Sequence, residues 1–162
     1  MADERVPMSR EGYEKVRADL DRMQNGEMIA VTKRIATARE MGDLSENAEY
    51  HAAREDQGML QARIDKLKDE LARAYIVDLA SLPKDTVVFG SRVKVKDLDL
   101  GEEEIYHLVG PGQVDYENNK ILTTSPIGQG LLGKKCGEVA EIKVPRGIMR
   151  YEVMEILPAD AG

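Results

Sequence analysis

The chain has 162 residues, of which 23 are Lys or Arg and 30 are Asp or Glu, so its formal net charge at pH 7 is −7. This length suits one or two small domains with a hydrophobic core and is too short for a large enzyme. Binding of bare nucleic acid through bulk charge needs Lys and Arg that displace phosphate counterions, and the acidic balance excludes that mode. Any contact with RNA or DNA must therefore be local or depend on a partner.

The cysteine content and the hydropathy indicate a compartment. A single cysteine, Cys136, excludes a disulfide framework and a zinc site built on two Cys-x-x-Cys pairs, and it fits a reducing environment. No stretch approaches the ~20 apolar residues of a membrane span, and the first residues lack the apolar core of a signal peptide. We therefore expect a cytoplasmic protein that makes no membrane contact.

From about residue 9 to residue 77 the apolar residues recur at helical spacing, and proline is absent. Two stripes with steps of three and four residues predict two helices, and the first stripe slips near Asn25 and Gly26. The first stripe is Tyr13, Val16, Leu20, Met23, Met28, Val31, Ile35 and Ala38, and the second is Tyr50, Ala53, Gln57, Leu60, Ile64, Leu67, Leu71 and Ala74. The slip costs some helix stability and leaves open whether the helix bends there.

The two stripes must pack against each other, because each needs an apolar partner and the connection between them is short. Gly42 breaks the first helix, and Asp43 or Ser45 can cap the second. About 30 residues per helix give an arm roughly 45 Å long. The sequence thus predicts an antiparallel coiled-coil hairpin over residues 1–78, with an acidic tip at 41–49.

Past residue 78 the period changes to short alternating runs separated by turn residues. Pro83 is expected to stop the helix, and residues 79–85 are expected to form a linker. The predicted strands cover residues 86–89, 92–95, 104–109, 120–124, 139–144 and 149–156, with a short helix near 126–132. We therefore expect an α+β chain in which a small, mainly antiparallel β domain, 86–158, follows the hairpin and leaves a tail at 159–162.

Acidic residues gather at the turn of the hairpin, where Asp43, Glu46 and Glu49 lie within seven residues. The local pattern alone favours capping, because Asp43-x-x-Glu46 matches a capping box that satisfies free amides. The alternative is that the end of a long arm displays carboxylates to a metal. Mg²⁺ prefers oxygen ligands, keeps several waters and takes one or two protein carboxylates. Such a site would have to be shared with another protein.

Two further patterns have a structural and a functional interpretation. Residues 128–133 match G-x-G-x-x-G, but the residues that follow predict strands rather than the rest of a dinucleotide fold, so a glycine-rich turn around a short helix is favoured. The basic residues near the turn can form a solvated helix flank, which their acidic neighbours favour, or a local phosphate-binding patch. These basic residues are Lys33, Arg34, Arg39 and Arg54.

The histidines and aromatic residues limit the chemistry. His51 lies beside Tyr50 and is expected to pack within the hairpin, whereas His107 lies in the other half, so no Ser/His/Asp or Cys/His set predicts nucleophilic catalysis. Tryptophan is absent and Phe89 is the only phenylalanine, so platforms for stacking bases are scarce.

The segment AREMGDLSENAEYHAARE, residues 38–55, closely resembles the signature of bacterial Gre transcript-cleavage factors, and most of all the GreA type. A second match, SPIGQGLLGK, lies at residues 125–134, and the resemblance covers nearly the whole chain in the same order. It implies a hairpin followed by a globular domain that resembles FK506-binding proteins. It also implies a bacterial RNA polymerase partner: the globular domain docks at the rim of the secondary channel and the hairpin enters the channel.

The resemblance also implies roles for individual residues. Asp43 and Glu46 would help to hold the second Mg²⁺ at the polymerase active centre, a metal that is shared in the complex while the chain alone binds no cofactor. Asn47, Glu49 and Tyr50 would shape the tip. Arg39 and Arg54 would belong to a basic patch that faces the nascent RNA. The segment linked to polymerase docking would include Ser125, Pro126, Ile127, Leu131 and Gly133.

The function implied by the resemblance is that of a monomeric elongation factor that is not itself an enzyme. It would stimulate the polymerase to cleave backtracked nascent RNA and so rescue arrested complexes. One alternative is a channel-binding regulator that modulates or inhibits polymerase without cleavage, although the presence of both Asp43 and Glu46 argues against it. A prolyl isomerase is disfavoured because such sites need an aromatic-lined pocket, and a coiled-coil chaperone would not need the tip acids.

Overall fold

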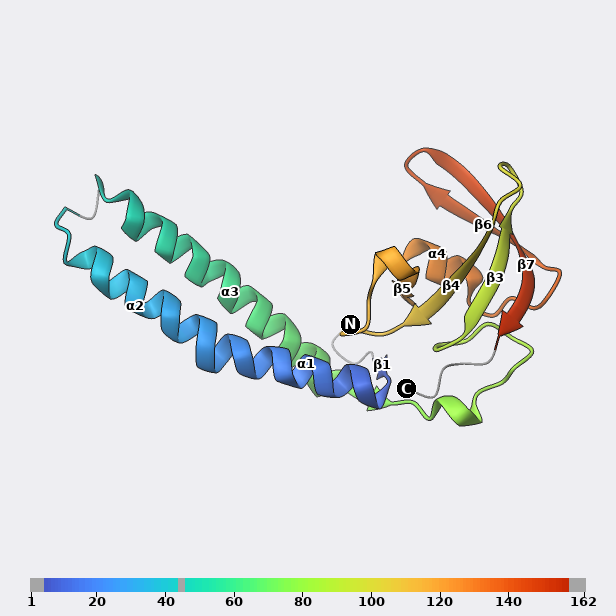
Figure 1. Cartoon of the computed structure of the whole chain (residues 1–162), viewed down its shortest axis with the longest axis horizontal. Helices are drawn as coiled ribbons and strands as arrows, with labels where there is room; N and C mark the ends of the chain where they lie inside the picture. Colours follow the sequence, from blue (N-terminus) through green and yellow to red (C-terminus); the bar gives the residue numbers. More distant parts are fainter. Residues whose placement is uncertain (1–4, 44–45, 158–162) are drawn as a thin grey trace. The chain divides into compact units, whose positions relative to one another are not determined.

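The computed structural model describes residues 5–43 and 46–157 (Figure 1). It divides the chain into two compact units. The hairpin unit is Glu14–Arg73, and the β unit consists of the described residues up to Tyr13 together with those from Ala74 onward. This division differs from the predicted hairpin over residues 1–78, because the first residues of the chain pair with the segment that follows the long helix.

The hairpin unit is built from antiparallel helices that share a thin apolar core. Val31, Leu60 and Ile64 are buried in this core, and Leu20, Met23 and Met28 pack against them half-buried. The apolar stripes read from the sequence therefore do face each other. The elements are α1 (Arg10–Arg22), the π-helix η1 (Met23–Glu27), α2 (Met28–Arg39) and α3 (Ala48–Arg73).

The slip in the first stripe coincides with the π-helix η1. The backbone N–H of Met28 donates to the carbonyl of Met23, five residues earlier. In an α-helix residues five apart point ~140° away from each other, since each residue turns by about 100°. The wider turn instead keeps both methionines on the apolar core.

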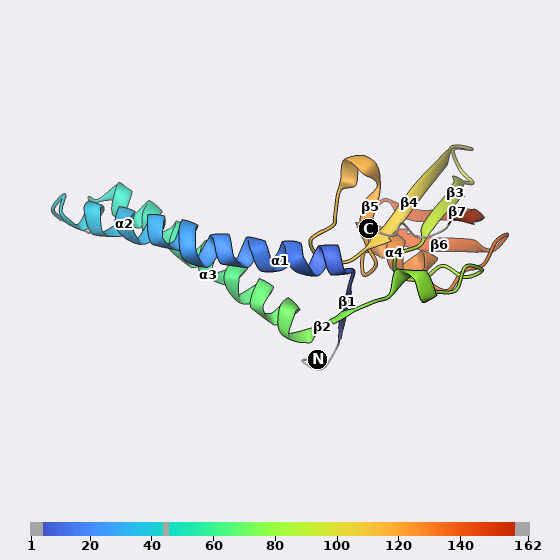
Figure 2. The same cartoon turned by 60° about the horizontal axis from the view of Figure 1, so that its bottom comes forward.

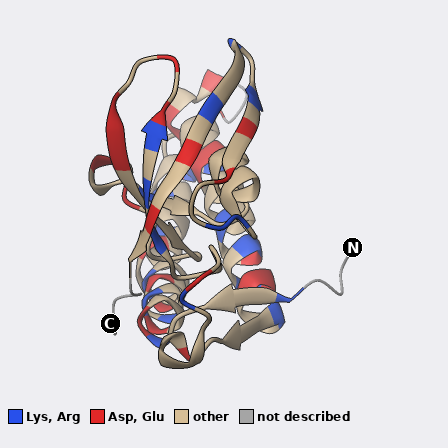
Figure 3. Ribbon diagram, turned by 90° about the vertical axis from the view of Figure 1, so that its right-hand side faces the viewer, with Lys and Arg blue, Asp and Glu red and all other residues tan. Residues whose placement is uncertain are grey.

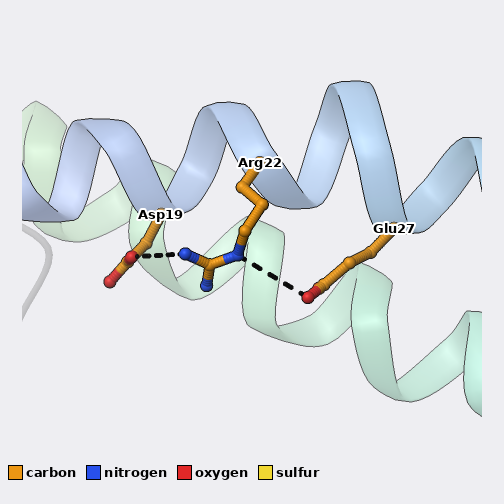
Figure 4. A network of polar contacts seen from close by, with 3 residues as sticks. All are labelled: Asp19, Arg22 and Glu27. Carbon is orange, nitrogen blue, oxygen red and sulfur yellow. Dashed lines mark hydrogen bonds and ion pairs between the residues drawn. The ribbon is translucent and has the colours of Figure 1, made fainter.

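An ion-pair network marks the same wide turn on the surface (Figure 4). Arg22 lies 2.9 Å from Asp19, its neighbour on α1, and 3.7 Å from Glu27, five residues later. A pair spaced by five residues fits the π-helical turn, whereas an α-helix brings together residues three or four apart. Arg22 and Glu27 are exposed and Asp19 is half-buried, so the network reports the geometry of the turn more than it stabilises it.

Helix α3 ends at Arg73 rather than near residue 77, and Pro83 is not what stops it. The next residues form β2 (Ala74–Ile76), which pairs in parallel with β1 (Val6–Met8) (Figure 2). The N–H of Val77 extends this ladder by donating to the carbonyl of Met8 at 2.9 Å. Pairing between residues almost 70 positions apart leaves no periodic signal in three-residue strands, so the sequence could not predict it.

The β unit contains a curled five-stranded sheet in the order β5-β4-β3-β7-β6. Neighbouring strands are antiparallel except β4 and β5, so the expected mainly antiparallel sheet is confirmed, with one parallel pair at its edge. The predicted strand at residues 86–89 is absent, because Val87 instead bonds through its backbone to Gly133 and Lys134. The strands are β3 (Arg92–Asp97), β4 (Glu103–Val109), β5 (Lys120–Leu122), β6 (Val139–Val144) and β7 (Gly147–Leu157), with a 3₁₀ turn at Tyr116–Asn118.

A continuous core lies between the sheet and the short helix α4 (Pro126–Leu131). Basic and acidic residues lie on neighbouring strands of the sheet (Figure 3), and Lys94 of β3 forms a 3.1 Å ion pair with Glu103 of β4. The predicted α+β class, a helical hairpin followed by a small β domain, is confirmed. The buried core residues are Val87, Val93, Val95, Tyr106, Leu108, Ile121, Leu131, Ala140, Ile142, Tyr151 and Val153.

Candidate functional site

The tip of the hairpin starts where α2 ends at Arg39. Gly42 follows with a φ of +112°, in the left-handed region that side chains disfavour, so the chain can turn sharply there. Asp43 and Glu46 are both exposed, and the N–H of Glu46 lies 3.4 Å from the carbonyl of Asp43. This contact holds the two acidic residues on one turn. The intervening residues, including Ser45, which was expected as a possible cap, lie outside the described residues.

Asn47 is the N-cap of α3, a position that the sequence analysis gave to Asp43 or Ser45. Its side-chain oxygen accepts a hydrogen bond from the N–H of Tyr50 at 3.0 Å. Its side-chain nitrogen donates to the carbonyl of Ala38 near the end of α2, at 2.6 Å. Three residues of the turn are good caps, and the sequence pattern alone could not choose among them.

The carboxylates of the tip can contribute to a metal site but cannot complete one. Oxygen ligands suit Mg²⁺, and Asp43, Glu46 and Glu49 are all exposed. Within residues 5–43 and 46–157 no group of three or more His, Cys, Asp or Glu residues could hold a metal ion. The donor chemistry of Asp43 and Glu46 therefore fits a Mg²⁺ ion whose remaining ligands come from elsewhere.

A small cluster of rings and one cation lies directly behind the acidic residues. The guanidinium carbon of Arg39 lies 5.9 Å from the centre of the Tyr50 ring, within the range of a cation–π interaction. Tyr50 also meets His51 edge to face, with ring centroids 5.6 Å apart. His51 is exposed, so the expectation that it packs within the hairpin is wrong.

The basic residues near the tip do not act as one group. Arg34 forms an ion pair of 2.9 Å with Asp56 on the opposite helix, which agrees with the solvated-flank interpretation. Arg39 contacts Tyr50 of its own hairpin. Lys33 and Arg54 are exposed. The two residues predicted to face RNA therefore differ, because Arg39 contacts an aromatic ring and Arg54 is exposed to solvent.

The predicted docking segment lies at α4 of the β unit. Ser125 caps this helix by accepting a hydrogen bond from the N–H of Gly128 at 3.1 Å, and Pro126 occupies the first turn with an exposed ring. Ile127 is half-buried and packs against the core. Leu131 is completely buried and packs in the core of the β unit, so within this segment its side chain anchors the helix.

Two glycines of the G-x-G-x-x-G pattern, Gly128 and Gly130, are packing residues of the same helix, and the third, Gly133, follows it. A Cβ on Gly128 would lie 2.5 Å from the carbonyl oxygen of Leu122 and 2.6 Å from that of Thr123. A Cβ on Gly130 would meet the side chain of Ile142 at 2.6 Å. Gly133 follows the helix with a φ of +81°. These contacts explain the glycines without a bound dinucleotide.

Two family models together match most of the chain. Residues 6–76 match "Transcription elongation factor, N-terminal", and residues 82–158 match "Transcription elongation factor, GreA/GreB, C-term". The class is therefore that of a transcription elongation factor. The chain belongs to the GreA/GreB family.

Individual relatives agree over nearly their full length. The transcription elongation factor GreA of Thermodesulfovibrio yellowstonii is 49% identical over 153 residues, which cover 94% of this chain and 97% of that protein. The protein of the same name from Thermosipho africanus is 42% identical over 156 residues, covering 96% and 99%. A solved structure, GreA factor homolog 1 (Gfh1) of Thermus thermophilus, is 29% identical with a TM-score of 0.46, covering 95% of this chain and 99% of that one.

No described helix is both long and apolar enough to cross a lipid bilayer. The expectation that the chain makes no membrane contact rested on the same property of the sequence.

Proposed function

We propose that this chain stimulates, in trans, the cleavage of backtracked nascent RNA by bacterial RNA polymerase and so rescues arrested complexes, without itself being an enzyme. The observation that supports this most is the pair Asp43 and Glu46, exposed on one turn at the end of a helical hairpin in a member of the GreA/GreB family. The hairpin enters the secondary channel of the polymerase, and the β unit of a monomer docks at its rim.

Asp43 and Glu46 act as two ligands brought to an incomplete metal site. In two-metal hydrolysis a second Mg²⁺ activates the attacking water, and this chemistry belongs to the shared ion. The chain's own contribution is to hold two carboxylates within one turn and to present them without burying them.

The exposed surface of residues 125–134, which begin at Ser125, docks on the polymerase. Pro126 is exposed and Ile127 is partly so, while the cap made by Ser125 and the buried anchor Leu131 keep the short helix in place. Gly133 continues the segment with a backbone bond from its N–H to Val87, so it shapes the loop. Among the basic residues, Arg54 contacts the nascent RNA. Arg39 contacts the RNA as well, while its guanidinium stays over the Tyr50 ring.

Stalled, backtracked elongation complexes test the metal-sharing role. We expect the wild-type chain to accelerate RNA cleavage over polymerase alone, and Asp43→Asn or Glu46→Gln to remove at least ~10-fold of that acceleration, since each deletes a metal ligand. Glu55→Gln is the matched control, because Glu55 is an exposed acidic residue farther along α3. Wild-type rates in both tip variants would overturn the metal-sharing role, and no acceleration by the wild type would favour the regulator without cleavage activity.

A binding experiment tests docking separately. Pro126→Ala combined with Ile127→Ser should weaken the affinity for polymerase, measured by competition with labelled wild-type chain, while leaving the hairpin helices intact by circular dichroism. Lys143→Ala, an exposed change on β6 outside this segment, should leave the affinity unchanged. Equal affinities for all three proteins would move the docking surface elsewhere.

A further inference from the structure

Asn47 makes two hydrogen bonds that do different things. Its oxygen accepts from Tyr50 of its own helix, which is ordinary capping, whereas its nitrogen donates across the turn to Ala38 of the preceding helix. We propose that the second bond is a latch that positions the tip acids for metal capture, so that Asn47 is a positioning residue for the activity proposed above. The inference rests on that proposed function.

The cross-turn bond is short and partly shielded from water. It measures 2.6 Å, Asn47 is half-buried, and Ala38 is the last buried residue of α2 with 3% of its surface exposed. The same carbonyl of Ala38 accepts the N–H of Met41 at 3.1 Å. The carbonyl oxygen of Ala38 thus accepts hydrogen bonds from both sides of the turn, from Met41 and from Asn47. Asp43 and Glu46 lie between these two residues in the sequence.

A second contact crosses the turn beside the first and also joins the end of α2 to the start of α3. Arg39, which follows Ala38, lies over the ring of Tyr50, whose N–H is the one that Asn47 caps. An exposed cation–π contact is worth only about 0.5–1 kcal/mol, so it supports the closed turn but does not replace the hydrogen bond. The base of the tip is thus joined by two cross-turn pairs, Ala38 with Asn47 and Arg39 with Tyr50.

This arrangement matters because shared metal ligands must be placed accurately. A functional constellation works when its groups are held to about 0.5 Å, and a displacement of 1 Å can cost roughly 100-fold in rate. Without the latch, Asp43 and Glu46 would have to be ordered each time the metal is captured, at a cost of conformational entropy. Loss of the latch should therefore weaken metal capture while leaving docking by the β unit unchanged.

The two bonds of Asn47 can be separated by substitution. Asn47→Ser keeps a good N-cap oxygen but has no donor that reaches Ala38. Asn47→Asp also keeps the cap and loses the donor, but it adds a negative charge, so a result common to both variants cannot be caused by charge. Asn25→Ser is the matched control, because it removes a side-chain hydrogen bond of an exposed asparagine, 2.6 Å to Asp21, far along the chain from the tip.

The first readout uses the full chain without polymerase or metal. Amide order parameters from NMR relaxation should fall at Asp43 and Glu46 in both Asn47 variants, whereas the amide of Tyr50 should keep its protection from hydrogen exchange because the cap is retained. The control should match the wild type. Unchanged order parameters at the acidic residues in both variants would overturn the latch, and loss of protection at Tyr50 would mean that Asn47 acts only as a cap.

The second readout is the Mg²⁺ dependence of RNA cleavage in backtracked complexes. In both Asn47 variants we expect the Mg²⁺ concentration for half-maximal stimulation to rise about 10-fold, with the maximal rate and the polymerase affinity close to wild type. A reduced maximal rate at an unchanged Mg²⁺ midpoint would reject the latch while the proposed function stands. If Asp43→Asn and Glu46→Gln also leave cleavage unchanged, the proposed function itself fails.

Discussion

Two helices of this molecule, α3 of the hairpin unit and α4 of the β unit, each have glycine in their interior for opposite reasons. A Cβ added to Gly58 of α3 would meet nothing within 4 Å, whereas one added to Gly128 of α4 would collide with two backbone carbonyls. The hairpin helix is thus open to solvent around its glycine, while the short helix is pressed against β5. The first glycine costs stability and the second permits the packing.

The same contrast separates the residues to which we assign functions in the two units. In the hairpin unit the acidic residues lie outside the core, so they can be replaced without disturbing the packing around Val31 and Ile64. In the β unit the motif that resembles the docking segment includes the buried Leu131 and the tightly packed Gly128. Substitutions in the hairpin tip should therefore report function, whereas substitutions of the buried Gly128 and Leu131 should mainly report folding.

The largest effect expected from this contrast is that of Leu131→Ala. Removing a completely buried leucine should lower the free energy of unfolding of the β unit by about 2–5 kcal/mol. Urea unfolding, followed by hydrogen exchange of amides in β3 and β7, measures it. Gln129→Ala on the exposed side of the same helix should change it by less than about 0.5 kcal/mol. A small effect of Leu131→Ala would mean that α4 is not anchored in the core.

Gly128→Ala comes next. The added methyl group would lie 2.5 Å and 2.6 Å from two backbone carbonyl oxygens, far inside van der Waals contact. Because backbone atoms cannot rotate away, α4 must shift. The free energy of unfolding of the β unit should therefore fall by roughly 1–3 kcal/mol. The hydrogen-exchange experiment on the β unit applies here too. Unchanged protection would show that the helix can move away from β5 without penalty.

The matching substitution in the hairpin unit, Gly58→Ala, should act in the opposite direction. It replaces an exposed helical glycine where nothing lies within 4 Å, so the hairpin should gain up to about 1 kcal/mol. Helix unfolding by circular dichroism at 222 nm measures the change. A destabilised hairpin would contradict the open surroundings of Gly58.

The smallest effect concerns pH and Glu70 on α3. Burial raises the pKa of this carboxyl, partly opposed by the nearby charges of Lys66 and Arg73. Since the folded state holds this proton more tightly than the unfolded state, Glu70 favours folding below its ordinary pKa, and this contribution is lost as pH rises through the raised value.

Replacing Glu70 by Gln should therefore stabilise the hairpin slightly at pH 7 and have no effect near pH 4. Thermal unfolding of both proteins at the two pH values provides the measurement. An equal difference between wild type and variant at both values would exclude the titration of Glu70 as its cause.

The parts that the sequence could predict are those encoded by local periodicity or by a motif. The helical stripes, the five strands from β3 to β7 and the short helix at Pro126 follow from spacing, and the Gre resemblance supplied the tip residues. The end of α3 was wrong because the pairing of Val6–Met8 with Ala74–Ile76 is long-range and only three residues long. Residues 86–89 alternate like a strand, but the loop after α4 takes their backbone bonds.

The tip shows a different limit. Motif and resemblance identified Asp43, Glu46 and Asn47, but capping residues occur so densely in the turn that only coordinates can show which of them holds α3. The second hydrogen bond of Asn47 depends on how two antiparallel helices are spaced, and no pattern within one helix carries that information. The functions of these residues still rest on the experiments described above.

The π-helix η1 also determines where the hairpin can change its length. If Gly26 were deleted, Met23 and Met28 would be four positions apart, an ordinary α-helical step that keeps both on the apolar stripe. Deleting Thr32 would instead leave the buried Ala38 six positions after Val31, which in an α-helix turns it about 120° away. A single-residue deletion that shortens the hairpin is therefore expected to be tolerated better between Met23 and Met28 than within α2.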